Sequence, residues 1–143
     1  KPDNILLTAD GVGKLSDFGL AMAANTTDMS GDNRIVGTPH YMSPEQARAE
    51  SVDHRSDIYA LGSTFFHLVT GQAPFGSYRP IQDVLRAHCV EPIPDPCELQ
   101  PELPLDCAMV IRMCMAKQPA ERYQTATALL EDIQALLDRS VLD

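Results

Sequence analysis

Apolar residues recur at two different spacings along this chain, and the spacing separates a short β element from several helices. Residues 5–8 (ILLT) and 14–18 (KLSDF) have the composition of short strands, and the stretch between them, ADGVG, is rich in turn-forming residues. We therefore predict a β-hairpin at the start of the chain.

Helical spacing dominates the chain after residue 43. Ser43, Pro44 and Gln46 form the pattern of a capping box with proline at the first helical position. Residues 53–70 carry apolar residues at helical spacing and end before Gly71, a common residue after a helix. Further helices are predicted at about 81–88, 105–115 and 125–138. The positions expected to face the core are Ile58, Leu61, Phe65 and Leu68 in the first long helix and Ala126, Leu129, Leu130, Ile133, Leu136 and Leu137 in the last.

The predicted fold class is therefore mainly α, with one β-hairpin and about five helices. A segment of 143 residues, 44% hydrophobic and 22% charged, is sufficient for one domain with a core. The net charge of −9 argues against nucleic acid or an anionic membrane as a partner, and no apolar run is long enough to span a bilayer. The chain opens on Lys1 without a signal-peptide pattern, so we expect position 1 to lie inside a longer protein.

The four cysteines do not have the spacing of a zinc site. They stand at positions 89, 97, 107 and 114, and none belongs to a C-x-x-C pair. We interpret them as small core residues of a protein in a reducing compartment, which indicates a cytoplasmic location.

Two oxygen-bearing side chains flank the predicted hairpin. Asn4 precedes the first strand and Asp17 lies at the end of the second, so antiparallel pairing brings them to the same end. An amide oxygen and a carboxylate suit Mg²⁺, and the ammonium of Lys1 nearby suits a phosphate. From spacing alone, polar residues at a turn and a strand end are an equally good interpretation.

Six segments in a fixed order carry a resemblance to a known family. They are KPDN at 1–4, DFG at 17–19, GTPHYM at 37–42, SPE at 43–45, DIYALG at 57–62 and PAERY at 119–123. In this order they resemble the catalytic loop, metal-binding motif, substrate-docking loop, end of the activation segment, central helix and final arginine segment of protein kinases. The KP and GT pairs are typical of serine/threonine kinases, and residues 37–46 look most like the bacterial Hanks-type members.

The resemblance implies a partial kinase domain over residues 1–139, from the catalytic loop onward in the C-terminal lobe of a two-lobed α+β fold, with 140–143 as the start of a linker or tail. It implies ATP and Mg²⁺ as cofactors and a protein bearing Ser or Thr as substrate. The residues to which it gives roles are Lys1 at the transferred phosphoryl group, Asn4 and Asp17 as metal ligands, Thr38 between docking and catalytic loops, Glu45 and Arg122 as a pair, and Asp57 below the catalytic loop.

Each charged residue also has a simpler interpretation. Glu45 and Arg122 suit a solvated surface, and an aspartate such as Asp57 near a helix start is favoured by the helix dipole alone. Two residues depart from the family pattern, because Ser43 replaces an alanine and Tyr59 replaces a tryptophan.

The segment contains no H-R-D motif, whose aspartate is the family's catalytic base; HRSD at 54–57 has one residue too many and follows DFG. We therefore expect these 143 residues to be inactive by themselves. The alternatives are a pseudokinase or a protein-binding scaffold with a docking groove around residues 79–102.

Residues 19–37 are polar, without periodicity, and longer than an ordinary connector. Thr26, Thr27 and Ser30 stand in the middle of this stretch and are candidate phosphorylation sites, since a phosphate adds about −1.5 to −2 charge. Arg34 is the only cation there to receive it. A flexible polar connector is the alternative interpretation.

Overall fold

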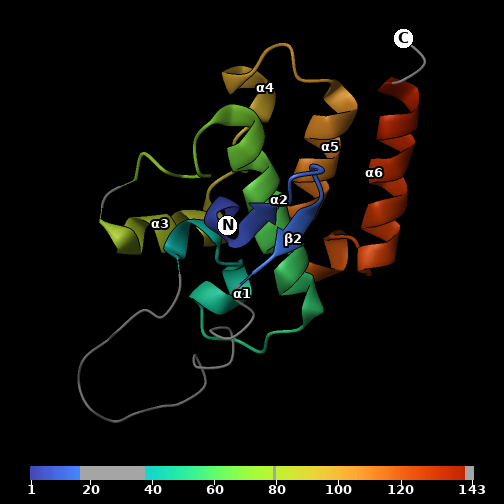
Figure 1. Cartoon of the computed structure of the whole chain (residues 1–143). Coiled ribbons are helices and arrows are strands. Elements are labelled where there is room, and N and C mark those ends of the chain that lie inside the picture. The colour runs from blue at the N-terminus through green and yellow to red at the C-terminus, as the bar shows by residue number, and fades with distance from the viewer. Residues whose placement is uncertain (17–37, 79, 141–143) are drawn as a thin grey trace.

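The computed structural model describes residues 1–16, 38–78 and 80–140, and these are mainly helical (Figure 1). Short 3₁₀ turns, labelled η, stand between the longer elements. The elements in chain order are η1 (Pro2–Asn4), β1 (Ile5–Leu7), β2 (Gly13–Leu15), η3 (Pro39–Tyr41), α1 (Pro44–Ala47), α2 (His54–Thr70), α3 (Ile81–Val90), α4 (Pro96–Leu99), α5 (Leu105–Cys114), η4 (Pro119–Glu121) and α6 (Ala126–Ser140). The predicted fold class, a hairpin followed by helices, is confirmed.

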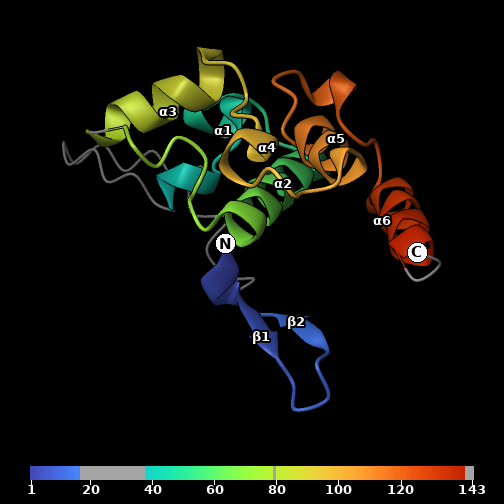
Figure 2. The ribbon, with the colours of Figure 1, turned by 90° about the horizontal axis from the view of Figure 1, so that it is seen from above.

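The hairpin pairs β1 with β2 in antiparallel register, with Ile5 opposite Leu15. Its turn is closed by two hydrogen bonds, since the backbone N–H groups of Thr8 and Gly11 donate to the carbonyls of Val12 and Thr8 at 2.9 Å. Gly11 has a φ of +81°, a conformation that glycine adopts without steric cost. Figure 2 shows the hairpin standing away from the helices.

Helix α2 lies at the centre of the molecule, and both of its predicted ends are confirmed. The Asp53 carboxylate accepts a hydrogen bond from the backbone N–H of Arg55 at 2.8 Å and caps the start of the helix. Gly71, with φ +73°, ends it in the left-handed conformation. Helix α5 packs against α2 so closely that a methyl group on Gly62 would overlap Cys114.

Two apolar clusters form the core, and each joins α2 to α5. One contains Ile58, Val110, Cys114, Tyr123 and Leu129. The other contains Tyr59, Phe66, Ile111 and Met115. Helix α2 is therefore buried on more than one face, because α5, η3 and α4 all pack against it.

Several predictions about buried positions were wrong. Leu68 is 58% exposed although it falls at helical spacing with Ile58, while Phe66 is almost fully buried. In α6, Leu130 and Leu137 are also exposed, while Leu129 of the same helix is buried in the cluster that contains Ile58. Helical spacing therefore identified α2 and α6 correctly, but it placed more residues of each helix in the core than the structure buries.

The sequence analysis did not predict helix α4, which lies in the proline-rich residues 92–104. Asp95 caps it by accepting a hydrogen bond from the Cys97 N–H at 3.0 Å, and Pro96 occupies its first position. Among the described residues, no helix has the length and hydropathy needed to cross a membrane.

Candidate functional site

The turn η1 brings Lys1 and Asn4 together ahead of the hairpin. The Asn4 backbone N–H donates to the Lys1 carbonyl at 2.9 Å, and the Lys1 ammonium lies 3.4 Å from the Asp3 carboxylate. Across the hairpin, the Ser16 N–H donates to the Asn4 carbonyl at 2.8 Å. Asn4 therefore lies beside Ser16, whereas Asp17, the next residue, is outside the described residues.

Thr38 begins the turn η3, which packs against both α2 and α3. Its carbonyl accepts a hydrogen bond from the Tyr41 N–H at 3.1 Å, and the Tyr41 hydroxyl lies 2.6 Å from Nδ1 of His67 on α2. The turn is thus attached to the central helix. Within the described part of the chain, no hydrogen bond joins the Thr38 side chain to residues 1–4.

Helix α1 begins with a capping box, as predicted. The Gln46 N–H donates to the Ser43 hydroxyl at 3.4 Å, and the Ser43 N–H donates to the Gln46 side chain at 3.0 Å. Pro44 occupies the first helical position, and Glu45 follows it. The cap therefore sets the direction of the Glu45 side chain, which is buried.

Glu45 and Arg122, 77 positions apart, form a bidentate buried ion pair. Nη1 and Nη2 of Arg122 donate to the two carboxylate oxygens of Glu45 at 2.7 and 2.8 Å. The Arg122 side chain is 0% exposed and the Glu45 side chain is 6% exposed. The Ser56 hydroxyl also donates to the Glu45 carboxylate. Burial disfavours the charged carboxylate, but the hydrogen bonds from Arg122 and Ser56 outweigh it and lower the pKa of Glu45 to about 2.

The remaining donors of Arg122 bind backbone carbonyls. Nε donates to Ala116 at 2.8 Å, Nη1 to Arg55 at 2.9 Å and Nη2 to Lys117 at 3.2 Å. The guanidinium also lies over the Tyr59 ring, 4.9 Å from its centroid. Arg122 therefore joins α1, the start of α2 and the segment after α5.

Tyr59 makes a second buried contact, with His88. Its hydroxyl lies 2.7 Å from Nδ1 of His88 on α3, and both side chains are fully buried. Burial, with a contribution from the charge of Lys117, lowers the pKa of His88 to about 3, so the imidazole is neutral. The Lys117 ammonium donates to the carbonyls of Ala87 and His88 at 3.2 and 2.9 Å.

Sequence reasoning missed Ser56 and Lys117. Ser56 is a single hydroxyl beside Asp57, and Lys117 stands among loop residues, so neither had a pattern that pointed to a buried partner. His88 lies in the helix predicted at about 81–88, but its contact with Tyr59 depends on the tertiary arrangement.

Other expected site residues are not brought together. Asp57 is exposed in the first turn of α2, and in the described ranges no hydrogen bond joins it to residues 1–4. The candidate phosphorylation sites Thr26, Thr27 and Ser30 lie outside the described residues, as does Asp17. The described part of the site is therefore Lys1 and Asn4 at the hairpin, Thr38 at η3, and the Glu45–Arg122 pair.

Comparison with known proteins extends across nearly the whole chain. A sequence model of the family described as "Protein kinase domain" matches residues 1–133. A probable serine/threonine-protein kinase of Clostridium acetobutylicum is 36% identical over 100% of the chain, which covers 22% of that protein. The probable serine/threonine-protein kinase PknB of Corynebacterium glutamicum is 39% identical over 99% of the chain, covering 23% of that protein.

A third relative, the serine/threonine-protein kinase PrkC of Bacillus subtilis, is 37% identical over 100% of the chain and 22% of its own length. The chain thus spans about a fifth of the length of these relatives. Both the family model and the relatives agree with the family that the six segments indicated. The chain belongs to the protein kinase domain family, and its relatives are bacterial serine/threonine kinases of the Hanks type.

Proposed function

We propose that the protein carrying this segment transfers the γ-phosphate of MgATP to serine or threonine hydroxyls of a protein substrate. In this proposal residues 1–139 are the portion of the kinase domain that begins in the catalytic loop, and 140–143 begin a linker or tail. The protein acts in the cytoplasm, by itself or as the cytoplasmic part of a membrane-anchored protein. The family match over residues 1–133 supports the reaction class.

The single observation that carries the proposal is the register of the hairpin. It pairs Ile5 with Leu15, and the Ser16 N–H donates to the Asn4 carbonyl at 2.8 Å. Ser16, which precedes Asp17, is therefore adjacent to Asn4. This adjacency supports a metal site to which Asn4 and Asp17 both contribute. Their hard oxygen donors have the chemistry that Mg²⁺ selects, with phosphate and water as its other ligands.

The residues have separate parts in the proposed reaction. Asn4 and Asp17 would hold Mg²⁺, which neutralises charge on the phosphoryl oxygens. Lys1, close to Asn4 through η1, contacts the transferred phosphoryl group. Thr38 links the docking loop to the catalytic loop, and Asp57 supports that loop from below. The Glu45–Arg122 pair attaches the residues after Thr38 to the helices.

The test is phosphate transfer by the full-length protein to a generic basic protein, using radiolabelled ATP. Asp17→Asn is expected to lower the rate about a hundredfold or more, because the neutral amide binds the metal more weakly, while the melting temperature changes little. A large fall in melting temperature, with activity lost only in proportion, would assign Asp17 a structural role instead.

The 143 residues produced alone are proposed to be inactive, because they contain neither the H-R-D aspartate nor the segments that bind adenine in this family. The same assay checks this with an Asp17→Ala version as the background. Transfer above that background would contradict the proposal.

A further inference from the structure

The turn η3 packs against both α2 and α3, whereas α3 itself packs mainly against α1 and η3. No side-chain hydrogen bond caps the start of η3. Its two backbone hydrogen bonds, from Tyr41 to Thr38 at 3.1 Å and from Met42 to Pro39 at 3.3 Å, both lie within the turn. Tyr41 attaches η3 to α2 through His67. The position of η3 therefore also depends on how α3 is fixed relative to α2.

Within the described residues, one side-chain hydrogen bond joins α2 to α3. The Tyr59 hydroxyl lies 2.7 Å from Nδ1 of His88, and both residues are 0% exposed. The two rings meet edge to face, with their centroids 5.6 Å apart. The Tyr59 ring is in turn covered by the guanidinium of Arg122, 4.9 Å from its centroid. This contact therefore attaches α3 to the central helix at a point that is closed to solvent.

The His88 ring is restrained by other neighbours as well. The Phe75 ring meets it in a T-shaped arrangement at 4.9 Å. The Lys117 ammonium donates to the His88 carbonyl at 2.9 Å, near the end of α3. Burial lowers the pKa of the imidazole, whereas the His40 backbone in η3 acts in the opposite direction, so η3 lies close to this ring. His88 thus lies between α2, η3 and the segment after α5.

Stability alone does not explain a histidine at this position. Nε2 of His88 is buried and has no hydrogen bond of normal geometry among the described residues, which is unfavourable for the folded state. Replacing both partners of such a hydrogen bond by apolar groups of the same shape is often nearly neutral for stability. The bond between Tyr59 and His88 has a geometric effect that packing does not supply, because it is directional and favours one orientation of α3 on α2.

We propose that His88 is a positioning residue for the protein substrate, because its bond to Tyr59 fixes α3 and α3 in turn supports η3. The inference rests on the proposed function, in which Thr38 and the residues that follow it dock the substrate. Without the hydrogen bond, η3 occupies its docking position in only a fraction of the molecules. The KM for the protein substrate then rises in inverse proportion to that fraction.

Tyr59→Phe is the main test, because it removes only the hydroxyl and keeps the ring that Arg122 covers. Phosphate transfer by the full-length protein is measured at varied concentrations of ATP and of a generic basic protein. Tyr59→Phe is expected to raise the KM for the basic protein about three- to tenfold, the effect of one lost hydrogen bond. The KM for ATP and kcat should change less than about twofold, because no residue proposed to contact ATP or Mg²⁺ takes part in this bond.

Tyr123→Phe is the matched control. Tyr123 is also buried, and its hydroxyl donates to Asp132 at 2.7 Å, but this bond leads to α6 and not to η3. The control therefore loses the same atom from a bond of the same length, and its KM for the basic protein should change less than about twofold. Thermal melts establish that both variants are folded.

Two variants of His88 test the same bond from its other side. The side-chain amide of His88→Asn places a hydrogen-bonding atom near the position of Nδ1, so this variant should keep part of the affinity for the basic protein. His88→Leu offers no such atom, and its KM for the basic protein should rise at least as much as that of Tyr59→Phe. An equal rise in the two His88 variants would mean that the hydrogen bond has no part in substrate binding.

Hydrogen exchange of the peptide that covers residues 38–47 gives a readout that requires no activity. The amides bonded within η3, those of Tyr41 and Met42, should exchange about threefold faster or more in Tyr59→Phe than in Tyr123→Phe. Unchanged exchange there overturns the inference. An unchanged KM for the basic protein in Tyr59→Phe, an equal rise in Tyr123→Phe, or an equal rise in the KM for ATP also overturns it. If the unaltered protein transfers no phosphate, the proposed function fails, and the exchange measurement alone decides whether His88 positions η3.

Discussion

Replacing Arg122 by alanine removes five hydrogen bonds, two to Glu45 and three to backbone carbonyls. It also leaves a buried carboxylate whose remaining side-chain donor, among the described residues, is the Ser56 hydroxyl. Breaking one partner of a buried pair costs about 3–5 kcal/mol, and the lost carbonyl bonds place Arg122→Ala at the upper end of that range. Glu45→Ala is expected at the lower end, because the guanidinium keeps its three carbonyl acceptors.

The double variant should be little less stable than Arg122→Ala alone. Once the guanidinium is absent, removal of Glu45 also removes an unpaired buried charge, so the two changes are expected to couple by about 2–3 kcal/mol. The assay is urea unfolding of the full-length protein, followed by the helical circular dichroism signal. The exposed pair Arg139–Asp106, joined at 2.9 Å, is the control, and its cycle should show coupling close to zero.

Additive losses for Glu45→Ala and Arg122→Ala would refute this reasoning. They would mean that the carboxylate and guanidinium do not interact in the folded protein, or that water screens them fully. Arg122→Lys provides a further check, because it keeps the charge but cannot form the bidentate contact, and it should recover only a minor part of the loss.

Three other results are expected. The pKa of Glu45 is lowered from its usual 4.5 to about 2, so the unfolded state binds the proton first as the pH falls. The stabilisation from this carboxylate is therefore complete above about pH 4.5 and is lost toward pH 2. Acid unfolding of Glu45→Gln should show a flatter pH dependence in this range. Gly62→Ala should cost about 1–3 kcal/mol, since its methyl group overlaps α5, and an unchanged melting temperature would contradict the close packing. Simultaneous replacement of Thr26, Thr27 and Ser30 by alanine should lower the activity of the full-length protein, with mass spectrometry identifying the phosphorylated residue; full activity would leave residues 19–37 as a connector.

Local features of the chain were predictable because their causes lie within a few residues. Ser43 and Gln46 form the capping box that their spacing indicated, and Gly71 ends α2 in the left-handed conformation. The hairpin turn follows from its residue types, with Gly11 at positive φ. The family also could be identified from the sequence, because six short segments in one order are far more specific than any one of them.

The buried faces and the polar contacts between distant segments depended on the tertiary structure. Helical spacing alone could not show that α2 is covered on several sides, so Leu68 was placed in the core while Phe66 was not. Ser56 gives no local sign of its contact with Glu45, which depends on how α1 docks on α2.

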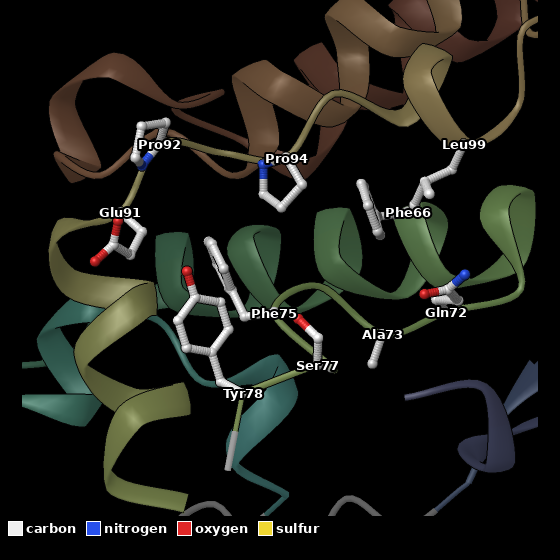
Figure 3. Close-up of a pocket in the computed structure, with 11 residues that line it drawn as sticks. Phe66, Gln72, Ala73, Phe75, Ser77, Tyr78, Glu91, Pro92, Pro94 and Leu99 are labelled. Atoms are coloured by element: carbon white, nitrogen blue, oxygen red, sulfur yellow. The ribbon is translucent and has the colours of Figure 1, made fainter. Parts of the chain in front are cut away.

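A cavity of about 280 Å³ between the loop after α2 and the segment that joins α3 to α4 arises in the same way (Figure 3). Its floor comes from α2, one wall from the loop after α2 and the other from the segment beyond α3. The sequence by itself determined where α1 and α2 begin and where α2 ends, because capping is a local hydrogen-bonding effect. Which side chains meet in this cavity was decided only by the packing of the helices, since that packing joins residues remote in the chain.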